Sequence, residues 1–472
     1  MKSDRQQAYL NLINQLLNSP SGEEAEVLKT HPELLDDGLV AAMLEEADNL
    51  RGFGVLDNAH RLMNCAGILL GMNNNSSVGV TGQAEADRLL EQGNQQHRIS
   101  QFREALQSWE DALTIYREIG NCQGEATSLG NLGVAYNSLG QYKRAIDFHK
   151  QHLEISREIG DRQGEANSLG NLGVAYYHLG QYKRAIEFYE QNLKISREMG
   201  DRQGEANSLG NLGNTYNSLG QYKRAIEFHE QSLVISRQIR NRQEEATSLN
   251  NLGIAYNSLG DFQRAIEFHE QSLVISRQIR NRQGEAMSLG NLGIAYKSLG
   301  QYKRAIEFYE QSLVMKRKIG DRQGEAISLG NLGIACQVLG DLNRAIDFHQ
   351  QSLVISRQIG NREGEADLLN NLGAIFFINN QLAEAEAALR ESIQILENIR
   401  SELVNNNHKI SILEIQSTTY RLLQKVLVAQ SKFDAAIEIS EMSRTRAFVE
   451  LLQKTLLTTL PLKPPLSKGG LG

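Results

Sequence analysis

Residues 124–162 read GEATSLGNLGVAYNSLGQYKRAIDFHKQHLEISREIGDR, and this stretch decides the fold because it recurs along the chain. Near-copies begin at Gly164, Gly204, Glu244, Gly284, Gly324 and Gly364. The period is 40 residues, as from 124 to 164, and it never slips. More divergent copies precede this run at about 83–122 and follow it at roughly 408–450. Such self-similarity predicts a stack of like units rather than one compact core.

Each unit contains the pattern of two amphipathic helices. Apolar residues recur at spacings of three and four within 126–136 and again within 142–155. Gly140 and Gly160 follow these stretches, where glycine can adopt the left-handed conformation that ends a helix. Asp161 can then cap the next helix through its carboxylate. The short connections predict antiparallel neighbours.

A glycine inside the first helix has a cost that some packing contact must offset. Glycine in a helix interior is about 1 kcal/mol less favourable than alanine, and most units carry glycines at the positions of Gly130 and Gly133. We expect Gly133 and Ala145 to face one another where the two helices of a unit cross.

The motif LxxLGxxY at 129–136, followed by AxxxH at 145–149, resembles the tetratricopeptide repeat signature, with leucine at its tryptophan position. The usual proline after the second helix is missing, and the unit is longer than the standard one. Longer units resemble those of Pins/LGN-type and kinesin-light-chain proteins, and HLEISREIGD at 152–161 is especially close to the Pins/LGN type. The resemblance implies an all-α, right-handed superhelical solenoid of antiparallel helix pairs.

The repeats divide the chain into four predicted parts. Residues 1–72 are helical in pattern without the repeat and are expected to form an N-terminal capping module. Residues 73–82, NNNSSVGVTG, have the composition of a linker. The array is expected over 83–450, in about nine units of which 123–402 are nearly identical. Residues 451–472 are expected to be a disordered tail.

The two ends carry a second resemblance. The region ahead of the repeats and the helix at 435–447, AAIEISEMSRTRA, resemble cyanobacterial repeat proteins that continue into a CHAT (caspase-like) peptidase domain. No such domain follows in this sequence. One hypothesis is therefore a truncated relative whose repeats act as a sensor arm with a separate effector.

Composition narrows the range of functions. The chain has 49 Lys and Arg against 56 Asp and Glu, which offers no broad basic field for nucleic acid or anionic lipid. The three cysteines are scattered, as in reduced cytosolic proteins. The N-terminus lacks the apolar segment of a signal peptide, and no stretch has the length of a membrane helix. We expect a cytoplasmic protein that binds neither membrane nor nucleic acid.

Catalytic constellations are not recognisable. His149 and its equivalents share one repeat position with Tyr189 and Tyr309, so this position is predicted to be a packing site rather than a general base. No paired histidines have metal-ligand spacing, and no phosphate loop follows a strand. We expect no catalytic residue, no metal, no cofactor and no enzyme activity.

A column of asparagines is the first candidate binding feature. It consists of Asn131, Asn171, Asn211, Asn251, Asn291, Asn331 and Asn371. An amide offers both a donor and an acceptor, as an extended peptide backbone requires. In the resembling families the matching asparagine lines the concave groove. The alternative is that these side chains bond the neighbouring unit and fix the stacking register.

Arginines form the second candidate column. It consists of Arg162, Arg202, Arg242, Arg282, Arg322 and Arg362. Guanidinium groups suit acidic side chains of a partner, and the resemblance to the Pins/LGN type implies an acidic partner segment. The alternative is a helix-surface pair with Glu165 and its equivalents, three residues further on.

A third set varies where the unit is otherwise copied: Asn137, Tyr177, Asn217, Asn257, Lys297, Gln337 and Phe377. Variation there either tunes specificity along the groove, where Tyr177 is the candidate binding residue, or reflects drift at exposed positions.

The leading hypothesis is a protein–protein interaction scaffold that binds a partner peptide in a concave groove. The sensor arm is the second hypothesis. A recent duplication with little selected function is the third.

Overall fold

The computed structural model describes residues 2–19, 24–52, 77–402 and 406–444, together with positions 58, 62, 63, 65 and 66. The chain forms two compact units, Met1–Asn241 and Arg242–Gly472. Each unit is a run of helices, and no strand occurs in these residues.

The first unit begins with α1 (Lys2–Asn18), α2 (Glu24–Lys29), a short 3-10 helix (Pro32–Leu34) and α3 (Asp37–Gly52). Its repeats comprise α5 (Ser77–Arg98), α6 (Phe102–Glu118), α7 (Cys122–Ser138), α8 (Tyr142–Glu158), α9 (Arg162–His178), α10 (Tyr182–Met199), α11 (Arg202–Ser218) and α12 (Tyr222–Gln238).

The second unit comprises α13 (Arg242–Leu259), α14 (Phe262–Gln278), α15 (Arg282–Ser298), α16 (Tyr302–Ile319), α17 (Arg322–Val338), α18 (Leu342–Gln358), α19 (Arg362–Ile378), α20 (Leu382–Glu402) and α21 (Asn406–Ala429). A further helical stretch covers 433–444.

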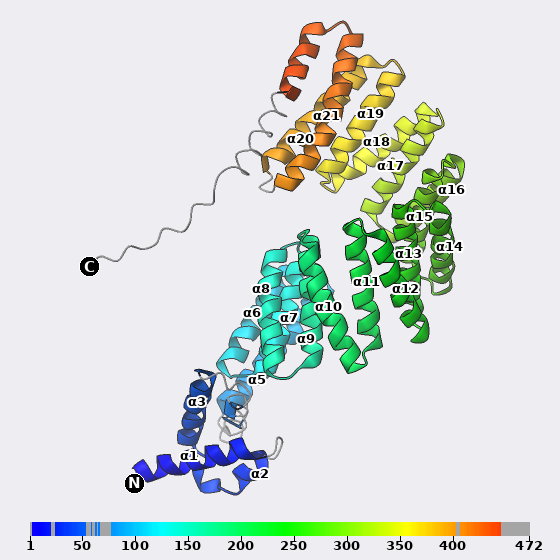
Figure 1. The fold of residues 1–472 in the computed structure, drawn as a ribbon. Coiled ribbons are helices and arrows are strands. Elements are labelled where there is room, and N and C mark those ends of the chain that lie inside the picture. The colour runs from blue at the N-terminus through cyan, green and yellow to red at the C-terminus, as the bar shows by residue number, and fades with distance from the viewer. Residues whose placement is uncertain are drawn as a thin grey trace, which may run out of the picture. The chain divides into compact units, whose positions relative to one another are not determined.

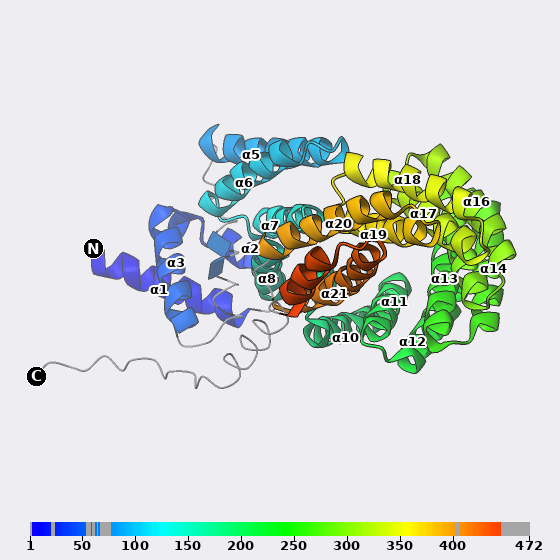
Figure 2. The same cartoon turned by 90° about the horizontal axis from the view of Figure 1, so that it is seen from above.

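Successive helices pack against one another inside each unit, from α5 to α12 and from α13 to α21. The two helices of a repeat lie antiparallel, and the next pair stacks on them (Figure 1). The orthogonal view shows the same neighbours, for example α13 to α18, side by side (Figure 2). The predicted all-α solenoid of helix pairs is confirmed.

The helix ends follow the predicted signals. Asp161 accepts a hydrogen bond from the backbone N–H of Gly164 at 2.8 Å and so caps α9. Gly160 has φ 72°, in the left-handed region. Arg240 and Arg280 stand at the equivalent position of later repeats and adopt φ 57°, which is unfavourable for a residue with a Cβ.

The glycine inside the first helix faces a ring of the second helix. The atoms nearest to a Cβ placed on Gly133 belong to the imidazole of His149, and at Gly173 they belong to the ring of Tyr189. The nearest neighbour of Gly133 is thus the ring of His149, and the expected approach of Ala145 stays a prediction. His149 and Tyr189 are buried, which agrees with the predicted packing role of this position. The glycine makes room for the ring.

The N-terminal region and the predicted linker differ in how far they match the predicted boundaries. Residues of 1–72 have a core of their own, in which Leu12, Leu28 and Met43 are buried together. Helix α5 begins at Ser77, so 77–82 of the predicted linker belong to a helix. Residues 73–76 and the predicted tail, 451–472, lie outside the described residues.

Candidate functional site

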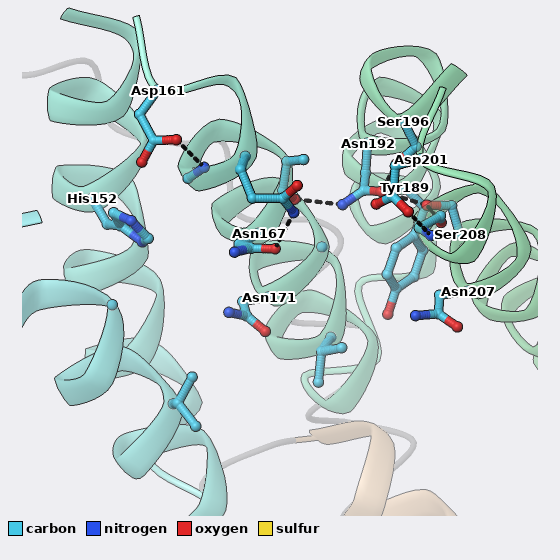
Figure 3. Close-up of a pocket in the computed structure, with 18 of the residues that line it drawn as sticks. His152, Asp161, Asn167, Asn171, Tyr189, Asn192, Ser196, Asp201, Asn207 and Ser208 are labelled. Carbon is cyan, nitrogen blue, oxygen red and sulfur yellow. Dashed lines mark hydrogen bonds between the residues drawn. The ribbon is translucent and has the colours of Figure 1, made fainter. Parts of the chain in front are cut away.

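A groove runs over the first helices of three successive repeats in the first unit. Residues of α7, α9 and α11 line it, with a few from α8 and α10, and the cavity measures about 710 Å³. Figure 3 shows Asn167, Asn171 and Asn207 among the side chains around it. The lining is dominated by amides, hydroxyls and glycines.

Helix periodicity explains why these residues share a face. In α9, Asn167, Gly170, Asn171 and Val174 are three or four positions apart, so they form one stripe. The core stripe of the same helix, which includes Leu169 and Leu172, is buried on another side. Gly170 has no side chain to extend into the groove, so the cavity stays open beside Asn171.

All seven asparagines of the column are half-buried. Asn131, Asn171 and Asn211 line the cavity of the first unit. Asn131 donates from Nδ2 to Oδ1 of Asn94 at 3.1 Å. In the second unit, Asn291 donates to Oδ1 of Asn250 at 2.9 Å. These two amides bond the neighbouring repeat, as the stacking alternative predicts.

Other members of the column make no hydrogen bond within the described residues: the side-chain amides of Asn171, Asn211, Asn331 and Asn371. The difference has a local cause. Asn291 bonds Asn250, which lies 41 residues earlier in the chain, and the corresponding residue is Gly130 for Asn171 and Gly170 for Asn211. Where the position carries glycine, no side chain reaches the amide.

The arginine column lies on a different surface. Arg162 and Asn171 are nine residues apart in α9, which places them about 180° apart around the helix. Arg202 correspondingly borders a hollow formed with α12 residues such as Glu227, not the asparagine groove. The two columns therefore cannot line one groove, although both were predicted for it.

Each arginine of this column contacts the glutamate three residues further on, as the alternative prediction holds. Arg162 donates to Oε2 of Glu165 at 2.5 Å, and Arg157 of α8 donates to Oε1 at 2.7 Å. The same pairs of column residue and glutamate are Arg202–Glu205, Arg242–Glu245, Arg282–Glu285, Arg322–Glu325 and Arg362–Glu365. Burial alone would raise the pKa of Glu285, but hydrogen bonds from Arg277 and Arg282 outweigh it and lower that pKa.

Tyr177 is half-buried, and its hydroxyl lies 2.9 Å from Oγ of Ser218. Its ring is near those of His178 and Tyr182. The residue in this varying set changes together with the buried residue twelve positions later in the same repeat. The pairs are Asn137–His149, Asn217–His229, Asn257–His269, Gln337–His349, Tyr177–Tyr189, Lys297–Tyr309 and Phe377–Leu389. Asn137 Nδ2 lies 3.3 Å from Nε2 of His149. For Asn137, contact with the ring of His149 thus supplies a structural reason for the residue at this position.

Another varying column, of which three residues line the groove, was not singled out from the sequence. Its members are Thr127, Asn167, Asn207, Thr247, Met287, Ile327 and Asp367. The signal for it was the spacing, because each precedes the column asparagine by four residues on the same face. Thr127, Asn167 and Asn207 line the cavity of the first unit. Thr247 and Met287 line a smaller one, about 110 Å³, in the second.

No group of three or more His, Cys, Asp or Glu suited to a metal ion occurs in the part of the chain that the structure describes. None of the described helices combines the length and apolar character needed to cross a bilayer.

The fold and the groove define a helical repeat protein built from antiparallel pairs. The model of the tetratricopeptide repeat family matches residues 85–158, 164–238, 244–318 and 324–398. These segments cover more than half of the chain, so the chain belongs to the tetratricopeptide repeat family.

Known relatives and solved structures are similar over parts of the chain. Tetratricopeptide repeat protein 28 of Mus musculus is 36% identical over 75 residues, which are 16% of this chain and 3% of that protein, and the Homo sapiens protein matches equally. The chain thus spans a small fraction of these relatives' length.

Among solved structures, apo RapI has a TM-score of 0.50 at 15% identity and covers 59% of this chain and 99% of its own. A signal transduction ATPase with numerous domains and a tetratricopeptide repeat sensor, from Pyrococcus horikoshii, has a TM-score of 0.52 at 14% identity. That match covers 74% of this chain and 54% of the archaeal chain. At these identities the likeness concerns the fold.

Proposed function

We propose that the chain is a protein-interaction scaffold that binds an extended segment of a partner protein in the groove of its first helices. This proposal rests mainly on the unbonded side-chain amides of Asn171 and Asn211. Their amides line an open cavity and make no hydrogen bond within the described residues. An amide can donate to a backbone carbonyl and accept from a backbone N–H, so the column matches the repeating pattern of an extended peptide.

The varying groove column would set which side chains the peptide presents. Asn167 and Asn207 offer polar contacts in the first unit. In the second unit Met287 is 42% exposed and Ile327 54% exposed, and both are apolar. The polar side chains at these positions of the first unit and the apolar ones of Met287 and Ile327 would favour different peptide residues.

Affinity capture from a lysate of the source organism tests the proposal. The bait is the wild-type chain or the Asn171→Ala, Asn211→Ala variant, and the retained segment is mapped by crosslinking and resynthesised as a peptide. We expect the double variant to bind that peptide at least about tenfold more weakly, because two bonds to the backbone are lost.

Asn291→Ala is the matched control, since its amide is already bonded to Asn250. Circular dichroism would establish that all variants keep their helices. Equal binding by the wild type and the double variant would place the site away from the asparagine groove and overturn the proposal.

A further inference from the structure

One wall of the groove carries a histidine where the later repeats carry serine. The position is occupied by Ala112, His152, Asn192, Ser232, Ser272, Ser312, Ser352 and Ser392. The serine hydroxyls donate to a backbone carbonyl of the preceding first helix, as Ser232 does to Ala206 at 3.0 Å and Ser352 to Ala326 at 2.8 Å. Asn192 donates likewise to Ala166. These side chains are satisfied inside the stack.

His152 is the exception. It is only 9% exposed, its Nδ1 has no hydrogen-bond partner, and its ring lines the cavity, as Figure 3 shows. Gly130 makes room for the ring, because a Cβ there would lie 3.0 Å from Cε1 and Nδ1 of the imidazole. Burial lowers the pKa of His152, and the nearby Asp161 opposes this only in part. Nδ1 is buried against Gly130, so a neutral imidazole protonated there leaves Nε2 as the acceptor available to the cavity.

Two carboxylates border the same cavity. The position that caps the first helices carries Asn121, Asp161, Asp201, Asn241, Asn281, Asp321 and Asn361. Asp321 forms an ion pair with Lys316 at 2.7 Å. Asp161 and Asp201 form no ion pair within the described residues, and both line the groove. Each accepts from the backbone of its own helix through Oδ1 and retains a second oxygen, Oδ2.

No lysine or arginine is among the described residues that line the cavity beside these carboxylates. Asp161 and Asp201 are the charged residues among those that line this cavity. The arginine column lies on the opposite side of the same helices. An acidic peptide would therefore meet repulsion here, whereas a cation would gain attraction and hydrogen-bond acceptors at once.

We propose that His152, Asp161 and Asp201 receive a lysine or arginine side chain of the bound segment. This inference rests on the proposed function, because the segment must lie along the asparagine groove for its side chain to reach this wall. It also reverses the sign of the partner expected from the sequence, which was an acidic segment. The unpartnered imidazole and the two unpaired carboxylates together form the basic-residue site.

The test starts from selection of peptides with the full-length chain from a random dodecapeptide display library. Recovered sequences are expected to be enriched in lysine and arginine over the unselected library. One recovered peptide is then measured in two forms, with its basic residue and with glutamine in that place. Binding is measured to the wild type and to Asp161→Asn, Asp201→Asn and His152→Ser variants.

These substitutions are chosen to preserve the fold. Asparagine caps the helix at the same position in other repeats, as Asn281 does by accepting from Gly284 at 2.9 Å. Serine occupies the position of His152 in five later repeats. Asp321→Asn is the matched control, because it removes the same charge outside this groove.

The basic peptide should bind the Asp161→Asn, Asp201→Asn double variant about tenfold more weakly than the wild type, and the control should bind as the wild type does. The glutamine peptide should lose affinity for the wild type but show no further loss with the double variant. Peptides that depend on Asn171 and Asn211 but carry no basic residue would overturn this inference and leave the proposed function standing. Recovery of no groove-dependent peptide would overturn both.

Discussion

Gly213 faces the imidazole of His229 so closely that a Cβ placed on Gly213 would lie 2.5 Å from Cε1 of the ring. Gly253 and His269 repeat the relationship in the second unit at the same distance. A large ring thus fills the position where the two helices of a repeat meet, and the glycine permits the close approach.

Gly213→Ala should therefore destabilise the protein, although alanine is the better helix former. The added methyl group would force His229 or the backbone to shift, at a cost of about 1–3 kcal/mol. The measurement is the midpoint of urea denaturation. Gly210→Ala is the control, because its Cβ would lie 3.8 Å from Oγ of Ser232, an ordinary contact. It should gain up to about 1 kcal/mol. Equal effects of the two substitutions would contradict the packing argument.

The buried histidines predict a loss of stability in acid. Burial lowers the pKa of His149, His229 and His349 to about 4 and that of His269 to about 3. The unfolded chain binds these protons near pH 6.5, so their contribution to stability is complete above that pH and is lost as the pH falls towards 4. The slope should be about 1 kcal/mol per pH unit for each histidine.

A variant with tyrosine at all four positions tests this origin, since Tyr189 and Tyr309 occupy the same position naturally. Its unfolding midpoint should change much less between pH 6.5 and pH 4.5 than that of the wild type. Parallel pH profiles of the two proteins would assign the acid sensitivity to other groups.

Arg280→Gly should stabilise the second unit. Arg280 has φ 57°, whereas Gly320 and Gly360 occupy the equivalent position at 72° and 70°. Relief of the left-handed conformation should gain about 1 kcal/mol, seen as a higher denaturation midpoint. Asn380→Gly, at φ 59°, should gain less because asparagine tolerates this region. A loss of stability in Arg280→Gly would show that the arginine side chain outweighs the strain.

Arg202→Ala should leave groove binding unchanged and lower stability by less than about 1 kcal/mol. The arginine donates to Gln238 at 2.6 Å, but its side chain is 45% exposed, and Glu205 retains Arg197. Peptide titration and urea denaturation on the same preparation separate the two effects. Weakened peptide binding in a stable variant would show that the arginine surface takes part in peptide binding.

How far the sequence predicts this protein depends on whether a feature repeats along the chain or arises between repeats. The period, the left-handed Gly160 and the capping Asp161 were predictable, because they follow from backbone geometry within one unit. The burial of His149 followed from its exchange with tyrosine in sister units. The asparagine column was also recognisable, because its spacing repeats with the unit.

By itself, the sequence determined the fold class, the two helices of each unit and the positions at which they begin and end. These depend on local conformational preference and on a hydrophobic pattern that is repeated in seven units. Only the tertiary structure decided which side chains share a surface. It separated the arginine column from the asparagine column, distinguished Asn171 from Asn131, and placed His152 beside Asp161 at an open cavity. The physical reason is that such contacts join residues of different helices, and their partners are set by packing across the stack rather than by spacing along it.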